Sequence, residues 1–185
     1  MSTWDELVLE CTRMVAADGL AAFSMRKLAD RVGIKAPSIY AHFGSKDALL
    51  ATARTNARSA LSAALQAGPT SRSARKRLIA TCLGYLRFAQ DQPHVFALLM
   101  MHTASARNSL EQPPDPDSPY ALLLARAQDF LGPAHPQAEV LCLGLWSLVH
   151  GAAVLRQTHL EAFAPAIAGL VEKNIEALLD GWSPR

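Results

Sequence analysis

The stretch "FSMRKLADRVGIKAPSIYAHFGSKDALL", Phe23 to Leu50, indicates two short helices joined by a tight turn and followed by a further helix. Ser24 can cap the first short helix, because its hydroxyl oxygen can accept a hydrogen bond from an amide of the first turn. Gly33 ends that helix, and Pro37 suits the first turn of the next one, where no backbone N–H is needed. Stacked on the helix that precedes it, this arrangement predicts a helix-turn-helix unit.

The spacing within the second short helix predicts which side chains face outward. Ile39 and Phe43 are four residues apart, so they share a face that can pack inward. The side chains left outside are Ser38, Tyr40, Ala41 and His42, with Ala36 and Pro37 at the N-terminal tip. In a helix-turn-helix unit this helix lies in the major groove of DNA, and its outer side chains meet the nucleic acid.

Charge supports the same interpretation. From Ser24 to Lys46 there are five bases and one acid, a net charge of +4, on a chain whose total is only +2. Tyrosine, histidine and lysine without carboxylates suit phosphate oxygens, and Lys46 begins the following helix, whose first amides also favour a phosphate. Such spacings also occur by chance, however, and the pattern alone leaves open that Tyr40 is a packing residue and that Lys46 is merely solvated.

The same residues resemble the DNA-binding signature of the tetracycline-repressor (TetR) family of bacterial transcriptional regulators, in "LADRVG", "APSIYAHF" and "SKDALL". The resemblance covers about the first quarter of the chain and implies an all-helical homodimer, with a three-helix DNA-binding head and a larger ligand-binding body. It implies DNA contacts at Arg26, Ala36, Pro37, Ser38, Tyr40, His42 and Lys46, the last three largely to phosphate. Ser24 and Lys35 complete the predicted set. Lys35 stands where the family often has Ser or Thr, and Ala36 offers no hydrogen bond, so we expect modest base readout.

Outside this stretch, helical periodicity appears almost everywhere and no convincing alternating strand is found, so the expected fold is all-α. The expected domains are a helix-turn-helix DNA-binding domain at 1–50 and a helical ligand-binding and dimerisation domain at 51–185. The basic run of Arg72, Arg75, Lys76 and Arg77 at a helix start is expected to be a solvated face.

Two residue sets in the body are candidates for binding. Aromatic, methionine and histidine side chains could line an adaptable apolar pocket for a small effector: Phe88, Phe96, Met100, Met101, Trp146 and His150. Ordinary core is the alternative for each of them. A face of small side chains, Gly144, Ser147, Gly151 and Val154, would let a helix of a second subunit approach closely. The segment "LWSLVHGAAVL", Leu145 to Leu155, is similar to a Trp…His-Gly element of one TetR subgroup.

Composition argues against several other classes. The three cysteines lie far apart among apolar residues, which predicts reduced, buried thiols in a cytoplasmic protein. The N-terminus lacks a signal-like pattern, and the 16-residue apolar run from Val140 to Leu155 is short for a membrane span, so we expect a buried helix and no membrane partner. No histidine pair has a third ligand at metal spacing, so no metal or cofactor is expected.

The sequence therefore predicts a ligand-responsive transcriptional repressor without catalytic activity, binding double-stranded operator DNA as a homodimer under the control of an unknown small molecule. Two alternatives stay open: a small helical enzyme using His150 or His102, and a helical protein–protein adaptor. The +4 segment favours the regulator, since neither alternative needs such a surface.

Overall fold

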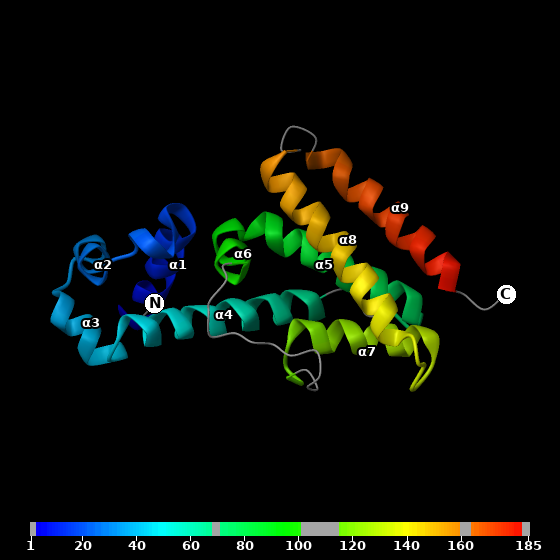
Figure 1. The fold of residues 1–185 in the computed structure, drawn as a ribbon, viewed down its shortest axis with the longest axis horizontal. Helices are drawn as coiled ribbons and strands as arrows, with labels where there is room; N and C mark the ends of the chain where they lie inside the picture. The colour runs from blue at the N-terminus through cyan, green and yellow to red at the C-terminus, as the bar shows by residue number, and fades with distance from the viewer. Residues whose placement is uncertain (1–2, 68–70, 101–114, 160–163, 183–185) are drawn as a thin grey trace. The chain divides into compact units, whose positions relative to one another are not determined.

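The computed structural model describes residues 3–67, 71–100, 115–159 and 164–182. These residues form nine α-helices and no strand, which confirms the predicted all-α fold (Figure 1). The helices are α1 (Thr3–Ala22), α2 (Met25–Val32), α3 (Ala36–Phe43), α4 (Lys46–Gln66), α5 (Ala74–Asp91), α6 (Pro93–Met100), α7 (Pro119–Leu131), α8 (Ala138–Thr158) and α9 (Ala164–Trp182).

The contacts between residues divide the chain into two compact units. The head unit holds α1, α2, α3, the first part of α4 as far as Ser59, and α6; the body unit holds the rest of α4 from Ala60 and α5, α7, α8 and α9. The predicted boundary at residue 50 and the first observed division, after Ser59, both fall within α4, and a second division falls between α5 and α6. The predicted folding domains, 1–50 and 51–185, stay a prediction, and the sequence did not indicate that α6 packs with the head.

Local signals explain how the helices of the head begin and end. The Ser24 hydroxyl accepts from the Lys27 amide at 3.5 Å, and the Ser45 hydroxyl accepts from the Ala48 amide at 3.1 Å at the start of α4. Gly33 has φ 75° and ψ 27°, the left-handed conformation that glycine adopts without a steric penalty, and its N–H donates to the Ala29 carbonyl. The predicted cap at Ser24 and the break at Gly33 are confirmed.

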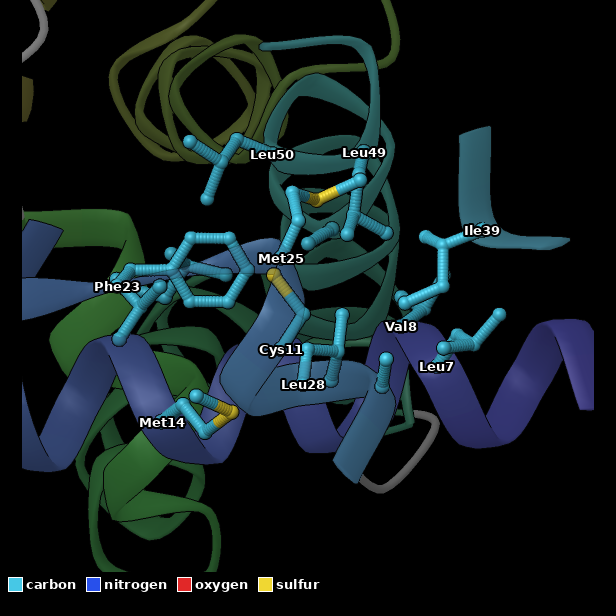
Figure 2. Close-up of a cluster of buried hydrophobic side chains, with 14 of the residues drawn as sticks. Leu7, Val8, Cys11, Met14, Phe23, Met25, Leu28, Ile39, Leu49 and Leu50 are labelled. Carbon is cyan, nitrogen blue, oxygen red and sulfur yellow. The ribbon is translucent and has the colours of Figure 1, made fainter. Parts of the chain in front are cut away.

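The head is held together by one apolar core. Ile39 of α3 is fully buried in it, as its spacing predicts, and Leu98 of α6 is fully buried in the same cluster. Figure 2 shows other members from α1, the α1–α2 connection, α2 and α4: Leu7, Val8, Cys11, Met14, Phe23, Met25, Leu28, Leu49 and Leu50. Phe43 is only half-buried, and its ring stacks on that of Trp4 with 5.8 Å between centroids.

The body is a set of helices packed around α5, which contacts α7, α8 and α9, while α8 also contacts α7 and α9. The helix α5 approaches α4 closely at Gly84, where an added Cβ would lie 3.2 Å from the Ala64 carbonyl oxygen. A glycine at this position therefore allows the two backbones to pack, because any larger side chain would need one of them to shift.

The basic run at the start of α5 is not simply a solvated face, which corrects the sequence expectation. Arg75 pairs with Asp180 at 2.7 Å and also donates to the Glu176 carbonyl at 3.1 Å, both on α9. Arg77 pairs with Asp129 of α7 at 2.9 Å. These two guanidinium groups connect the first turn of α5 to α9 and α7.

The apolar run predicted to be a buried helix forms most of α8, and it is buried on one face only. Leu141, Leu145 and Val149 are buried, whereas Val140 is 59% and Leu143 is 54% exposed. Among the described helices, α8 alone has the length and hydropathy of a membrane span, with a mean hydropathy of 1.7 over its most apolar window. The core helix of a soluble protein meets the same criterion.

Candidate nucleic-acid interface and effector site

The outer face of α3 is exposed along its length. Tyr40 is 48% exposed, and Ser38, Ala41 and His42 are also exposed, whereas Ile39 turns into the core. Pro37 is exposed at the tip of the helix and Ala36 is half-buried. The structure therefore presents a phenol, an imidazole and a hydroxyl from one short helix, and all three can donate hydrogen bonds to phosphate or base edges.

The positive charge around α3 is smaller than the sequence count suggests. Arg26 and Lys27 on α2 and Lys35 before α3 are exposed. Arg31, in contrast, pairs with Glu10 of α1 at 2.8 Å. Because Glu10 lies outside the stretch whose charges were counted, sequence counting could not separate Arg31 from the other bases.

Two residues of the predicted DNA-binding set have partners within the head. The Ser24 hydroxyl caps α2, as described above, and its side chain is half-buried. The Lys46 ammonium donates to the Phe23 carbonyl at 2.9 Å and to the Leu20 carbonyl at 3.4 Å, and lies 5.3 Å from the centre of the Phe23 ring. The predicted phosphate contact of Lys46 stays a prediction, and these partners were not expected.

In the body, a tyrosine joins two of the predicted effector residues. The Tyr85 hydroxyl of α5 lies 2.9 Å from His150 Nδ1 of α8. Burial raises the pKa of Tyr85 to about 12, although a hydrogen bond with the Trp146 side chain acts in the opposite direction. The Trp146 ring also packs against that of Tyr120 of α7, with 5.6 Å between centroids. Sequence analysis missed both tyrosines, although Tyr85 lies three residues before Phe88 and so shares its side of α5.

The remaining members of the predicted effector set are distributed over the chain. Phe88 of α5 is buried in the body, whereas Phe96 is buried in α6 of the head and Met100, at the end of α6, is 37% exposed. Met101 and His102 lie outside the described residues. Trp146 and His150 are thus brought together through Tyr85.

A groove in the head has a different lining. Its walls are Glu6, Leu9, Glu10, Arg13, Arg31 and Val32, of α1 and α2. None of the predicted effector residues borders it. Its charged pair Arg31–Glu10 connects α2 to α1, whereas Arg13–Glu10 is a pair within α1.

The predicted dimer residues lie along one side of α8 that the described residues leave partly exposed, with Leu178 of α9 near Gly144. Gly144 and Ser147 are exposed, Gly151 is half-buried and Val154 is 39% exposed. Val140 and Leu143 continue this face toward the helix start, since residues spaced by three, four and seven share one side of a helix. On α9, Leu170 is also 59% exposed.

The thiols of Cys11, Cys82 and Cys142 are buried, and burial raises the pKa of each to about 12. They are therefore protonated and unreactive at neutral pH. Within the described part of the chain, no group of three His, Cys, Asp or Glu side chains is placed to hold a metal ion.

Comparison with solved structures supports the fold. A Rhodococcus sp. RHA1 protein of unknown function has a TM-score of 0.76 at 22% identity, with 100% of this chain and 97% of that chain covered. A tetR family transcription regulator from Shewanella sp. PV-4 has a TM-score of 0.76 at 16% identity, with both chains fully covered. At such identities the likeness concerns the fold alone.

Sequence comparison identifies the family. An HTH-type transcriptional regulator of Saccharopolyspora erythraea is 32% identical over 108 residues, which are 58% of this chain and 44% of that regulator's length. The model of bacterial regulatory proteins of the tetR family matches residues 9–53. The model of the tetracyclin repressor-like C-terminal domain matches residues 78–178, more than half of the 185 residues. The Trp…His-Gly subgroup stays a prediction, but the chain belongs to the tetR family of bacterial regulatory proteins.

Proposed function

We propose that this protein is a cytoplasmic, homodimeric, DNA-binding transcriptional regulator, and that it represses transcription until a small, mainly apolar molecule releases it from its operator. The observation that carries the proposal is the exposed outer face of α3, with Ser38, Tyr40 and His42 presented after the Gly33 turn. Catalysis is not part of the proposal.

The chemistry of α3 supports phosphate contacts more than base readout. Tyr40 and His42 can donate to phosphate oxygens, and the exposed cations Arg26, Lys27 and Lys35 flank them in the sequence. Ala36 and Pro37 offer no hydrogen bond, but either can meet a thymine methyl group in the major groove. We therefore expect a strong salt dependence, because each phosphate contact releases counterions.

The exposed apolar side chains on one face of α8 support dimerisation. Val140, Leu143 and Val154 would be removed from water if α8 and α9 of two subunits formed a four-helix interface. A single head contacts few base pairs, and two heads about one helical turn of DNA apart would read a pseudo-palindromic operator. Gly151 lies on this face, and a Cβ added there would meet no atom within 4 Å. Gly151→Arg should fold yet give monomers in sedimentation, with loss of operator binding; dimers of the variant would refute this interface.

The effector is expected to act on the body. Tyr85, His150 and Trp146 form a hydrogen-bonded group on the apolar helices α5 and α8, which suits a largely apolar molecule that carries one polar group. The chain passes from α5 of the body into α6 of the head at Pro93, so the two units are connected there and within α4. A molecule that favours one arrangement of α5 could change operator affinity through these connections, typically by about 1–3 kcal/mol.

The test begins by selecting fragments that the purified protein retains from genomic DNA. Affinity for a selected fragment is then measured from about 50 to 200 mM salt for wild type, Tyr40→Phe and His42→Ala. Lys76→Ala, an exposed lysine of α5 in the body, is the matched control. Both α3 variants should bind all sequences more weakly, and the control should bind like wild type. Retention of no fragment, or equal loss in the control, would refute the assignment of α3 to DNA.

A further inference from the structure

The Lys46 side chain has a set of partners unlike those of the other head lysines. It is half-buried at the first position of α4, and its ammonium meets two main-chain carbonyls and one aromatic ring. We propose that Lys46 is a positioning residue that clamps the connection between α1 and α2. It then affects DNA through the shape of the helix-turn-helix unit and not through a phosphate contact, a consequence that rests on the proposed function.

The two carbonyls need such a partner because of how α1 ends. Gly19, with φ 80° and ψ 164°, is non-helical and kinks the last part of α1. Leu20 is among the last four residues of the helix, whose carbonyls have no partner within it. The C-terminal end of a helix carries partial negative charge, so an ammonium there is favourable. Lys46 therefore satisfies the Leu20 and Phe23 carbonyls with a charge of the right sign.

The position of the clamp determines what it can control. Phe23 is 4% exposed in the head core, where Figure 2 shows it with side chains of α1, α2 and α4, and it directly precedes Ser24, the cap of α2. Lys46 stands at the start of α4, where Leu49 and Leu50 enter the same core. The contact thus joins the beginning of α2 to the end of the α3–α4 turn, 23 residues later. Both ends of the segment that carries α2 and α3 are held at one point.

A phosphate contact that drew the same ammonium away would break the clamp. An ammonium has three N–H donors; two of those of Lys46 point to carbonyls, and one is left for another acceptor. Moving the charge to DNA would leave the Phe23 carbonyl without this partner and would separate the cation from the ring. Lys35 offers a contrast, since it is exposed and its side chain makes no cap hydrogen bond to α3. It is therefore the matched control for the loss of one positive charge in the head.

The first experiment needs no DNA. Amide hydrogen exchange is measured on the full chain for wild type, Lys46→Met, Lys46→Arg and Lys35→Met, since methionine keeps an unbranched apolar stem and removes the charge. In Lys46→Met, the amides of α2 should exchange about tenfold faster or more, because charge-assisted hydrogen bonds to the start of that helix are lost. Lys35→Met should match wild type, and Lys46→Arg, which keeps charged donors, should fall between. Equal α2 exchange in Lys46→Met and Lys35→Met would overturn the clamp.

The second experiment separates positioning from phosphate contact. Affinities of the same variants for a selected fragment and for unrelated DNA are measured over the same salt range. If Lys46 acts by position, Lys46→Met lowers the ratio of specific to unrelated affinity and leaves the salt slope unchanged. A slope that flattens by about one unit in Lys46→Met means a phosphate contact and overturns the proposal. Should the protein bind no DNA at all, the proposed function fails, while the exchange experiment still decides the clamp.

Discussion

Replacing Tyr85 by Phe tests whether the hydrogen-bonded group in the body contributes to stability. The Tyr85 side chain is 6% exposed, and the change keeps its ring while removing the hydroxyl that lies 2.9 Å from His150 Nδ1. The variant removes this partner from a half-buried imidazole, and losing one partner of a buried hydrogen bond costs about 1–3 kcal/mol. Trp146 also loses its partner, but it is 41% exposed, so water can replace that bond. We therefore expect the free energy of unfolding to fall by about 1–2 kcal/mol.

The assay is urea unfolding of the full chain at one fixed protein concentration, because the stability of a dimer depends on concentration. Tyr40→Phe is the matched control: it removes the same hydroxyl from a 48% exposed side chain, and should change stability by less than about 0.5 kcal/mol. A double-mutant cycle with His150→Phe should give a coupling energy of about 1 kcal/mol. If Tyr85→Phe is as stable as Tyr40→Phe, or if the coupling is zero, the hydroxyl–imidazole contact does not stabilise the body.

Three further results are expected. Gly84→Val should lower the free energy of unfolding by about 1–3 kcal/mol in the same urea assay, since a Cβ there would already lie 3.2 Å from the Ala64 carbonyl; an unchanged midpoint would contradict the close packing of α4 and α5. At pH 8, Cys11, Cys82 and Cys142 should react with a thiol reagent only as fast as the protein opens, whereas rapid native labelling would contradict their burial. Because burial raises their folded pKa to about 12, the unfolded chain loses these protons first, so urea midpoints should fall as the pH rises from roughly 9 toward 12; a flat profile would count against the shift.

The helix-turn-helix unit could be predicted from the sequence because its signals are local. The Ser24 cap, the Gly33 turn and Pro37 in the first turn of α3 each depend on residues within four positions. The inward direction of Ile39 follows from helical spacing within a single short helix. The exposed face of α3 and the resemblance to the tetR family can both be predicted from the same short stretch.

Contacts between distant segments were decided only by the tertiary structure. Leu98 is visibly apolar in the sequence, but helical spacing does not show that it belongs to the core of the head. Nor does spacing show that the Lys46 ammonium meets the carbonyls of Leu20 and Phe23. In the body, Tyr85 became a candidate only when α5 and α8 brought its hydroxyl to His150. The physical reason is that a side chain's helix position follows from its own neighbours, whereas its hydrogen-bond partners and burial depend on helices that the chain brings back from far along the sequence.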